Sequence, residues 1–244
     1  RQMCIRDRDY MANELDTLEE DQRKFISNVS HDFRSPLTSI KGYIEAMLDG
    51  TIPPELQNKY LNIILFETDR LTKLTSNLLD VNNFDKDNIF LDISRFNLHD
   101  SIRKTAGALE GVAAKKDIHF DLELSDTEPL WVSGDKDKIQ QVLHNLMDNA
   151  VKFSHEGSSI LISTREKGNR VFVSVKDSGI GIPKDDLGKI FERFYKTDLS
   201  RGKDKLGTGL GLSICKEIIT AHKQNLDEVS TEAVSYTHLT LPTT

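Results

Sequence analysis

The sequence predicts an α+β protein in two parts: an N-terminal helical hairpin that dimerises into a four-helix bundle, and an α/β two-layer sandwich domain. Two patterns lead to this prediction. Up to about residue 84, mostly apolar residues recur at alternating spacings of three and four, as on one face of a helix. Beyond about residue 95, helical patterns are separated by short segments of period two, which are typical of strands packed against helices.

The first predicted helix runs from near Tyr10 to Leu48. Pro36 lies inside it, where the missing backbone donor should kink or loosen the helix. The helix carries a seam that is typical of a coiled coil or a helical bundle. This seam consists of Leu15, Leu18, Gln22, Phe25 and Val29.

A glycine followed by prolines, within residues 49–54, predicts the end of this helix and the start of another. The second helix has a seam of its own, formed by Tyr60, Ile64, Glu67, Leu71, Leu74, Leu78 and Val81. Two helices bury too little apolar surface by themselves. A hairpin of this kind is therefore expected to pair with a second copy in a four-helix bundle.

A polar segment at residues 85–94 is predicted to link a helical domain at residues 9–84 to a second domain at residues 95–232. The second domain has helix and strand patterns in separate runs, which favours a sheet with helices on one face. The expected elements are a helix capped by Asn97, a strand at 118–124, a helix from Asp135 to about Phe153, a strand hairpin at 159–166 and 170–177, and a helix at about 208–221.

The composition argues against several classes of protein. A net charge of −7 does not indicate a nucleic-acid-binding surface. Two cysteines, Cys4 and Cys215, do not make a disulfide framework, and no apolar run is long enough to span a bilayer. The histidines between the first predicted helix and residue 232 lack the ligand spacing of a zinc site: His99, His119, His144, His155 and His222.

The two ends of the chain can be encoded by opposite strands of one DNA segment. Residues 1–7 read RQMCIRD and residues 234–240 read VSYTHLT. Codons exist for the first segment whose reverse complement translates as the second. We therefore predict that residues 1–8 and 233–244 are translated sequencing adapter, and we exclude them from the predicted fold.

A histidine stands beside a carboxylate on the first predicted helix. Within residues 25–37, His31 is followed directly by Asp32, and Arg34 and Ser35 come next on the same helix. Three further motifs lie downstream of this histidine.

The first of these motifs follows a predicted strand. Asp177 ends the strand, and Gly179 and Gly181 come after it. A carboxylate in this place can accept a hydrogen bond from an exocyclic amine, and glycines let a ligand approach the backbone closely. A simple turn at the end of the strand is the alternative interpretation.

A second glycine motif opens the last predicted helix. Gly207, Gly209 and Gly211 precede it, where exposed N–H groups and the helix dipole favour a phosphate. No predicted strand comes before the motif, which argues against a dinucleotide-binding fold. A flexible segment leading into the helix is the alternative interpretation.

The helix predicted to start at Asp135 has a polar stripe opposite its apolar face. Asn145, Asn149 and Lys152 share this stripe by their spacing. Amide oxygens suit Mg²⁺, and a lysine suits the phosphates that Mg²⁺ accompanies. A merely solvated stripe is the alternative interpretation.

Together these motifs, in this order, resemble the ATP-binding domain of sensor histidine kinases, which belongs to a superfamily with gyrase-type, heat-shock chaperone and mismatch-repair ATPases. Residues 191–195 resemble the phenylalanine-rich box of the kinases, and residues 29–37 resemble their phosphoacceptor box. The resemblance covers nearly all of residues 10–232. It implies a dimerisation and phosphotransfer hairpin followed by an ATP-binding domain.

The resemblance implies that ATP phosphorylates His31 and that the phosphoryl group passes to an aspartate of a response-regulator receiver domain. Asp32 would hold the Nδ1 proton and act as the base, and Arg34 would interact with the phosphate. The implied assembly is a homodimer with no nucleic-acid partner. The parent protein would be anchored in the inner membrane, with this part in the cytoplasm.

The implied ligands are ATP and Mg²⁺. Asp177 would read the adenine amino group, Asn149 would ligate Mg²⁺, and Asn145 with Lys152 would support the metal and the phosphates. Within a predicted lid at residues 183–206, Arg193 and Lys196 are the expected phosphate contacts. The other residues implied to line the nucleotide site are Gly179, Gly181, Phe191, Phe194, Tyr195, Gly207, Thr208, Gly209, Leu210 and Gly211.

The sequence departs from the family pattern in two places. Ser35 replaces the threonine or asparagine that accompanies phosphatase activity, although a serine hydroxyl could still orient a water. After Ala221 and His222 the usual glycine pair is missing, and with the tail excluded the final strand of the sheet is expected to be absent, which should lower stability.

Two other functions remain open on the sequence alone. One is an ATPase of the wider superfamily that forms no phosphohistidine, which the sequence around His31 disfavours. The other is a dimerisation scaffold whose nucleotide site has decayed, which the expected loss of a strand keeps open.

Overall fold

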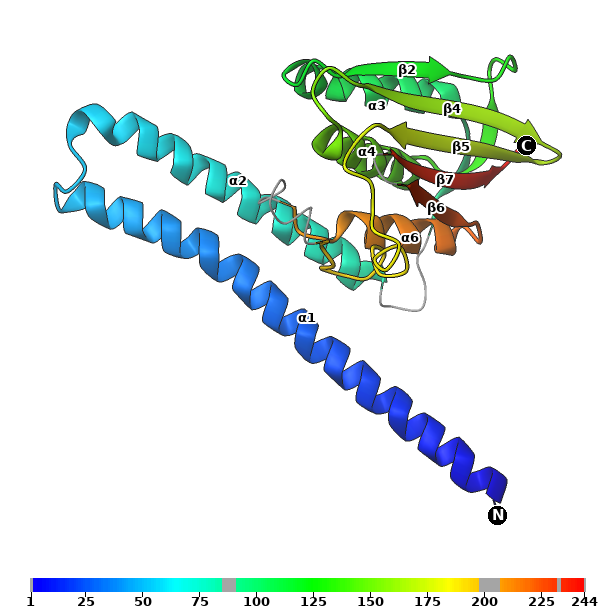
Figure 1. The fold of residues 1–244 in the computed structure, drawn as a ribbon, viewed down its shortest axis with the longest axis horizontal. Coiled ribbons are helices and arrows are strands. Elements are labelled where there is room, and N and C mark those ends of the chain that lie inside the picture. Colours follow the sequence, from blue (N-terminus) through cyan, green and yellow to red (C-terminus); the bar gives the residue numbers. More distant parts are fainter. Residues whose placement is uncertain (1, 85–90, 198–206, 232–233, 244) are drawn as a thin grey trace. The chain divides into compact units, whose positions relative to one another are not determined.

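The structure, a computed structural model, describes residues 2–84, 91–197, 207–231 and 234–243. The chain divides into two compact units, Arg1–Leu78 and Leu79–Thr244 (Figure 1). The division falls within the second helix and not at the predicted linker, of which residues 85–90 lie outside the described residues.

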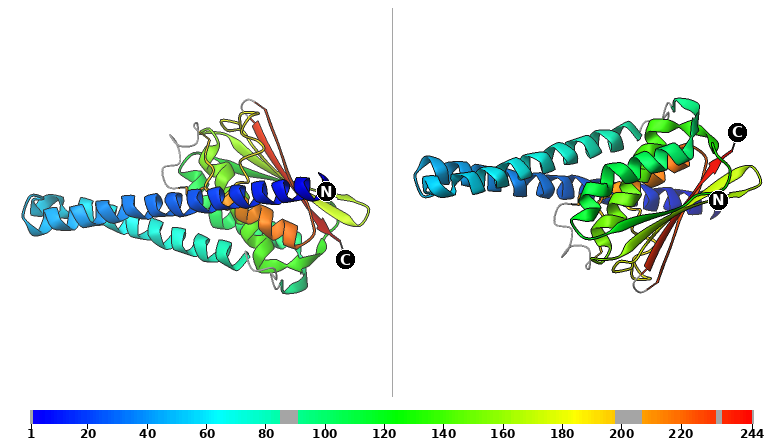
Figure 2. Two further views of the ribbon diagram at one scale, coloured as in Figure 1. Left: turned by 90° about the horizontal axis from the view of Figure 1, so that it is seen from below. Right: turned by 90° about the horizontal axis from the view of Figure 1, so that it is seen from above.

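The first unit is a helical hairpin, as predicted. Helix α1 spans Gln2–Leu48 and helix α2 spans Pro54–Phe84, and both views of Figure 2 show them leaving a common turn. Within that turn Gly50 has a φ of +80°, and the Thr51 amide donates to Asp49 Oδ1 at 2.9 Å. α1 stays helical through Pro36, and the predicted kink or loosening there stays a prediction.

The hairpin leaves many large apolar side chains exposed. These are Ile26, Leu37, Ile44 and Leu48 on α1, and Leu56, Leu61, Leu65, Phe66 and Leu79 on α2. Leu48 is the extreme case, with 83% of its surface exposed. Exposed apolar surface of this extent is typical of helices that associate with another chain.

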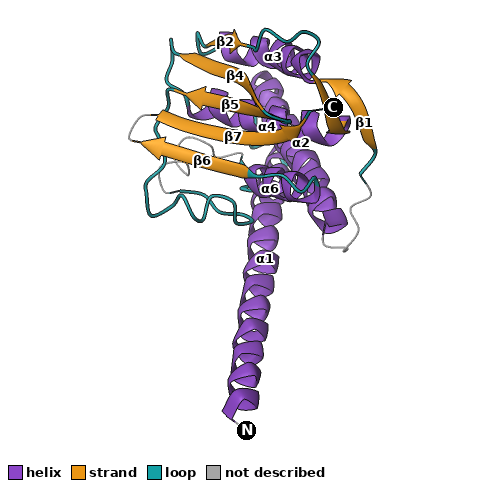
Figure 3. Ribbon diagram, turned by 90° about the vertical axis from the view of Figure 1, so that its right-hand side faces the viewer, coloured by secondary structure: helices purple, strands orange, loops and turns teal. Residues whose placement is uncertain are grey.

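The second unit is a two-layer domain, as predicted. Helices α3 (Leu98–Ala114), α4 (Lys136–Phe153) and α6 (Gly211–Ala221) cover one face of a five-stranded sheet (Figure 3). The strand order is β2-β4-β5-β7-β6. β2 pairs with β4 in parallel, and the other neighbours are antiparallel. The strands are β2 (His119–Glu123), β4 (Ser159–Lys167), β5 (Arg170–Asp177), β6 (Leu226–Thr231) and β7 (Val234–Pro242).

The core lies between the sheet and the helices. Alternate residues of β4 and β5 are fully buried on the helix side, and α4 supplies the facing stripe. The members with no exposed surface include Ile160, Ile162, Val171 and Val173 from the strands and Ile139, Leu143 and Met147 from α4. Burial of each such side chain contributes about 1.5–3 kcal/mol, so this face is strongly stabilised.

The predicted cap at Asn97 is confirmed, and Asp135, where the next helix was predicted to begin, is the cap of that helix. The Asn97 side chain accepts a hydrogen bond from the His99 amide at the start of α3. The Asp135 side chain accepts one from the Lys138 amide at 3.1 Å at the start of α4. Each cap satisfies an amide that the helix itself cannot, which fixes where these two helices begin.

Besides β6 and β7 of the main sheet, two short strands were not predicted. β1 (Ile93–Asn97) and β3 (Trp131–Asp135) form a separate antiparallel pair, so the predicted linker at 85–94 runs into a strand. Trp131 is 38% exposed, and its ring lies under the Arg95 guanidinium, whose central carbon is 4.9 Å from the ring centroid. The cation–π contact explains how this side chain is accommodated at the surface.

The expected loss of the final strand does not hold in this structure. Residues 234–242 form β7, which pairs with β5 on one side and β6 on the other. Leu239 and Leu241 alternate with less apolar residues and are at most 1% exposed, which is the pattern that an inner strand requires. The origin of residues 233–244 in a sequencing adapter stays a prediction about the DNA. The presence of β7 does not decide it, because any segment in which apolar and polar residues alternate could form this strand.

The last helix is shorter than predicted. α6 begins at Gly211 and not at residue 208. At its other end Lys223 takes a φ of +55°, and its amide bonds to the Thr220 carbonyl while the Gln224 amide bonds to Ile219. This is the Schellman arrangement, in which a glycine usually occupies the position that Lys223 holds here.

Candidate phosphotransfer and nucleotide sites

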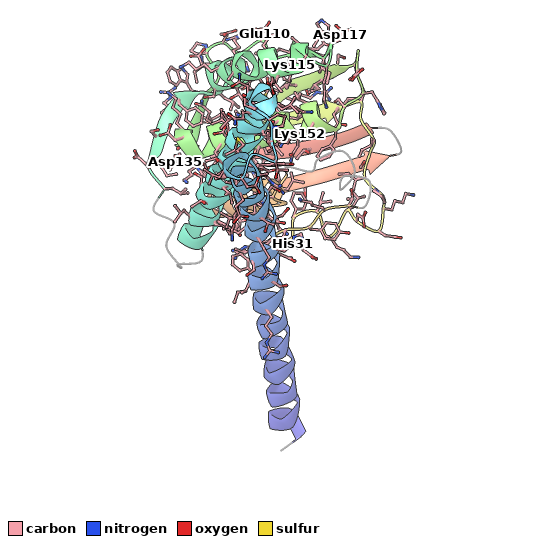
Figure 4. All side chains as sticks on the ribbon, turned by 90° about the vertical axis from the view of Figure 1, so that its left-hand side faces the viewer. His31, Glu110, Lys115, Asp117, Asp135 and Lys152 are labelled. Carbon is pink, nitrogen blue, oxygen red and sulfur yellow. The ribbon has the colours of Figure 1, made fainter. Side chains whose placement is uncertain are left out.

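His31 and Asp32 form a pair on the surface of α1, where Figure 4 marks His31. Nδ1 of His31 lies 3.3 Å from Oδ1 of Asp32. The histidine side chain is 82% exposed, whereas the aspartate is only 22% exposed. Because the carboxylate engages Nδ1, the ring is oriented with Nε2 as the nitrogen that can react with an incoming group.

The other predicted residues of this site lie on the following turn. Arg34 and Ser35 are both exposed, while Pro36 is buried. A buried proline beside exposed polar residues fixes the backbone locally and leaves the side chains of Arg34 and Ser35 accessible to a partner.

α4 carries the second predicted cluster. Asn145 Nδ2 lies 3.5 Å from the carbonyl oxygen of Gly211, a long contact that sets the polar stripe against the start of α6. Lys152 Nζ pairs with Asp148 Oδ2 at 2.8 Å. The i,i+4 spacing of Asp148 and Lys152 was available in the sequence, but the pair was not predicted. Asn149 lies half-buried between these contacts.

A lysine that follows α3 holds the end of α4. Lys116 Nζ donates to the carbonyl oxygens of Val151 at 2.9 Å and of Lys152 at 2.7 Å. An ammonium group at a helix C-terminus satisfies carbonyls that lack intrahelical partners and interacts favourably with the dipole. No local signal in the sequence indicates this contact, which joins residues far apart along the chain.

The first glycine motif packs on the end of α4. The Gly179 amide donates to Asp177 Oδ1 at 3.0 Å. A Cβ atom on Gly179 would lie 2.4 Å from the Phe153 carbonyl oxygen, so this position has room only for glycine. Gly179 also forms a β-bridge with Ser154. Asp177 is thereby held next to the C-terminal end of the helix that carries Asn149.

The second glycine motif contacts the aromatic box. The Phe194 amide donates to the Gly209 carbonyl oxygen at 2.9 Å. Both residues have positive φ angles, +65° for Phe194 and +69° for Gly209. A Cβ atom on Gly209 would lie 2.7 Å from the Phe194 carbonyl carbon. The two predicted motifs are therefore in backbone contact, and the contact requires glycine at 209.

The side chains of the aromatic box are tied to α6 and to the preceding loop. Arg193, predicted to contact phosphate, is paired with Glu217, and its Nη2 lies 2.8 Å from Glu217 Oε1. The other contacts are Lys216 Nζ over the Phe191 ring at 5.5 Å and Tyr195 OH to Asp186 Oδ1 at 2.7 Å. Lys196 is half-buried, and residues 198–206 of the predicted lid lie outside the described residues.

The cysteine of the second unit, Cys215, is not reactive. Burial raises the pKa of the Cys215 thiol to about 12, so at neutral pH it stays protonated and is no nucleophile. Among the described residues, no group of three histidine, cysteine, aspartate or glutamate side chains is placed to hold a metal ion. None of the described helices combines the length and apolarity needed to cross a membrane.

Comparison with known proteins assigns both units. Residues 21–86 match the model of the His Kinase A (phospho-acceptor) domain, and residues 134–244 match that of the histidine kinase-, DNA gyrase B- and HSP90-like ATPase. The chain is 36% identical over 218 residues to the sensor histidine kinase WalK of Bacillus subtilis (strain 168), with 87% of this chain and 35% of WalK covered. It therefore spans about a third of the length of this curated relative.

Solved structures agree. The histidine kinase ThkA in complex with the response regulator protein TrrA matches with a TM-score of 0.74 and 32% identity, covering 91% of this chain and 61% of ThkA. The ThkA catalytic domain alone matches with a TM-score of 0.56 and 35% identity, covering 62% of this chain and 95% of that domain. Because nearly all of that domain is matched, and because the two family models follow each other in the order of the two structural units, the chain belongs to the histidine kinase family.

Proposed function

We propose that this chain is the kinase core of a two-component sensor, which uses ATP to phosphorylate its own His31 and then transfers the phosphoryl group to a response-regulator aspartate. The observation that carries the proposal is the exposed His31–Asp32 pair on a chain that also holds an ATPase-type domain. A plain ATPase would have no use for an oriented, exposed histidine on a phosphoacceptor helix.

The proposed reaction begins with attack by Nε2 of His31 on the γ-phosphorus of ATP. The bond from phosphorus to the bridging oxygen of ADP breaks as the new P–N bond forms. Asp32, 3.3 Å from Nδ1, holds the proton on that nitrogen and accepts it as the ring gains positive charge. Arg34, exposed on the next turn, supplies a cation near the transferring phosphoryl group.

The nucleotide would bind where α4, β5 and the start of α6 meet. Asp177 would accept a hydrogen bond from the adenine amino group, and the backbone around Gly207, Gly209 and Gly211 would face the phosphates. The contact of Asn145 with Gly211 supports this arrangement, because it sets the polar stripe of α4 against the glycine motif. Phe191, Phe194, Tyr195, Lys196, Thr208, Leu210, Gly179 and Gly181 would complete the walls of the site.

Mg²⁺ suits this donor set. The side-chain oxygen of Asn149 is a hard, neutral ligand, and Mg²⁺ usually combines one or two protein oxygens with waters and substrate phosphates. When bound, the ion would neutralise phosphate charge. Lys152 would add a positive charge, tempered by its ion pair with Asp148.

The partners follow from the hairpin. Exposed leucine, isoleucine and phenylalanine side chains on α1 and α2 would be buried in a homodimeric four-helix bundle. The matched ThkA structure is a complex of that kinase with a response regulator protein. By analogy, a receiver domain would dock on the hairpin near His31. We also propose that the parent protein is membrane-anchored outside this segment, with this part in the cytoplasm and no nucleic-acid partner.

Autophosphorylation tests the proposal. The chain is incubated with γ-labelled ATP and Mg²⁺ beside His31→Ala and a matched control, His119→Ala, at an exposed histidine of β2. Acid-labile, base-stable label on the parent and the control, absent from His31→Ala, is the expected result. Label that persists in His31→Ala would contradict the assignment. Released phosphate without label would favour an ATPase, and neither product would favour a scaffold.

Transfer to the partner needs a separate experiment. Phosphorylated protein is mixed with a receiver domain, and label is expected to move to the receiver and to disappear when its acceptor aspartate is replaced. Ser35→Ala then tests whether the Ser35 hydroxyl supports phosphatase activity. If dephosphorylation of the receiver is unchanged in Ser35→Ala, the serine has no part in that reaction.

A further inference from the structure

Helix α6 lies antiparallel along α4 in a fixed register. Three polar contacts join α6 and its C-cap to α4 and its N-cap. Residues later in α6 contact residues earlier in α4, which is the order expected of antiparallel helices. The contacts are His222 with Asp135, Cys215 with Val142, and Gly211 with Asn145. The glycine motif at the start of α6 therefore sits beside the polar stripe of α4, and His222 makes the contact at the opposite end of α6.

Both ring nitrogens of His222 are engaged. Nε2 accepts a hydrogen bond from the Asp135 amide at 2.9 Å, and Nδ1 lies 2.7 Å from the Ile218 carbonyl oxygen. A carbonyl can only accept, so Nδ1 must carry the proton, while Nε2 must present its lone pair to the amide. These two partners define a single neutral tautomer, with the proton on Nδ1.

The ring has little freedom to move. A Cβ atom added to Gly134 would lie 3.4 Å from two ring atoms of His222, so the imidazole is close to the backbone of β3. Its own backbone amide donates to the Ile218 carbonyl at 3.1 Å, which ties the residue to the last turn of α6. A shift of α6 along α4 would break the contact with Asp135 before the ring could follow.

Asp135, the partner of His222, is itself firmly held. Its side chain caps α4 through Oδ1 and the Lys138 amide at 3.1 Å. Its Oδ2 accepts from the Asp92 amide at 3.1 Å, which connects it to the segment before β1. Figure 4 marks Asp135 and Lys152 near the two ends of α4. The contact with His222 therefore fastens α6 to the fixed N-terminus of the helix that carries the polar stripe.

We infer that His222 is a positioning residue for the nucleotide site: by accepting a hydrogen bond from the Asp135 amide it sets the register of α6 on α4 and so places Gly211, the last glycine of the motif, beside Asn145. This inference rests on the proposed binding of ATP by the same domain. His222 does not touch the nucleotide, because α6 separates it from the glycine motif by about 16 Å along the helix axis.

Two substitutions separate the ring's two roles. In His222→Gln, the amide oxygen can reach the place of Nε2 and still accept from Asp135. In His222→Asn, the shorter side chain reaches only the place of Nδ1, so the bond to Asp135 is lost. His119→Asn, at an exposed histidine of β2, is the matched control. Two quantities are measured for each protein: hydrogen exchange at the Asp135 amide and the dissociation constant of Mg²⁺–ATP.

The expected result is a paired change in one variant only. His222→Asn should lose protection at the Asp135 amide and bind Mg²⁺–ATP about fivefold more weakly, the effect of one lost, partly buried hydrogen bond. His222→Gln and His119→Asn should stay within about twofold of the parent in both quantities. Rescue by glutamine would not occur if any loss of the ring simply disrupted packing.

Several outcomes would overturn the inference. One is that the Asp135 amide of His222→Asn stays protected from hydrogen exchange. Another is that this protection is lost in His222→Asn but the dissociation constant of Mg²⁺–ATP does not change. A parent chain that does not bind Mg²⁺–ATP would remove the proposed function and this inference together, although Asp135 exchange would still report on the bond. If His222→Asn does not fold, ¹H–¹⁵N correlation spectra of the parent test the inference instead. A proton on Nε2 of His222 would show that this nitrogen does not accept a hydrogen bond from the Asp135 amide.

Discussion

Arg193 donates two hydrogen bonds, from Nε at 3.1 Å and from Nη2 at 2.8 Å, to the same oxygen of Glu217, Oε1. The side chains are 31% and 23% exposed, so solvent screens the pair only in part. The pair joins the aromatic box to the middle of α6, 24 residues further along the chain. This geometry is that of a clamp between the two motifs, and the phosphate contact of Arg193 stays a prediction.

Removing either partner of this clamp should have the same effect. We expect Arg193→Ala and Glu217→Ala each to weaken ATP binding by a few-fold, since a partly exposed ion pair contributes about 0.5–1 kcal/mol. The double variant should lose little more than either single variant, because both changes remove one interaction. Titration with ATP measures all three. A direct phosphate contact would instead make Arg193→Ala costly even when Glu217 is already replaced.

The glycines of the nucleotide motifs should differ sharply in their tolerance of alanine. Gly209→Ala should destabilise the domain and abolish ATP binding, because its Cβ would overlap the Phe194 backbone and its φ is positive. Gly211→Ala should be tolerated, since it stands in α6 and its added Cβ would lie 4.0 Å from Asn145 Cγ. Gly188→Ala is the control, with no atom within 4 Å of its Cβ. Thermal unfolding and ATP titration of the three variants test the order.

Lys223→Gly should stabilise the domain. Lys223 ends α6 with a φ of +55°, a conformation that costs a side-chain-bearing residue about 1–2 kcal/mol relative to glycine. The greater freedom of glycine in the unfolded chain offsets part of this, which leaves a gain of about 0.5–1 kcal/mol in the free energy of unfolding. Urea unfolding measures it.

The matched control for this substitution is Lys115→Gly. Lys115 ends α3 with a φ of −64°, so the unfolded-chain entropy of glycine is added without relief of strain. This variant should be destabilised. Equal changes in Lys115→Gly and Lys223→Gly would contradict the interpretation of the α6 terminus.

Buried His99 should make the domain sensitive to mild acid. Burial lowers the pKa of His99, and the nearby charges of Glu128, Arg103, Glu166 and Asp100 modify the shift. In the unfolded chain the His99 side chain therefore binds a proton near pH 6.5, whereas in the folded domain it is protonated only at lower pH. Stability is complete above that pH and falls as the pH drops below it, by up to about 1.4 kcal/mol per pH unit for one proton.

Urea unfolding at about pH 7.5 and about pH 5.5, on either side of the ordinary histidine pKa, measures this dependence. In the parent, His99 Nε2 lies 3.1 Å from the Thr164 hydroxyl, and the amide of His99→Gln can still form this hydrogen bond. The loss of unfolding free energy between the two pH values should therefore be smaller in His99→Gln than in the parent. His119→Gln, at an exposed histidine, should keep the parent's full loss. An unchanged loss in His99→Gln would show that other groups control the acid transition.

The sequence was sufficient where a pattern is periodic or a motif is contiguous. Both hairpin helices, the cap at Asn97, the helix start near Asp135 and the β4–β5 hairpin follow from apolar spacing and local hydrogen-bonding chemistry. β1 and β3 were missed because each has only five residues and because each pairs with a strand that lies far away in the sequence. Short strands of this kind carry too little periodicity to be distinguished from loops.

The candidate site was predicted in composition but not in its contacts. The roles of Glu217, Lys116 and His222 depend on which helices lie side by side, and no local spacing contains that information. Arg193 shows the consequence: the sequence suggested a phosphate contact for it, which stays a prediction, but gave no sign of the carboxylate that α6 brings to it.

For a chain that is synthesised with residues 234–242 in place, the position of β7 has a consequence for folding on the ribosome. β6 is synthesised before β7, but β6 reaches the sheet only by pairing with β7, which lies between it and β5. On the ribosome, the segments up to α6 can therefore assemble while β6 has no neighbour to join, and the sheet is completed when the later segment inserts. Such non-local pairing is slow to form, so a nascent chain stalled between β6 and β7 would present an open strand edge to chaperones and to other nascent chains.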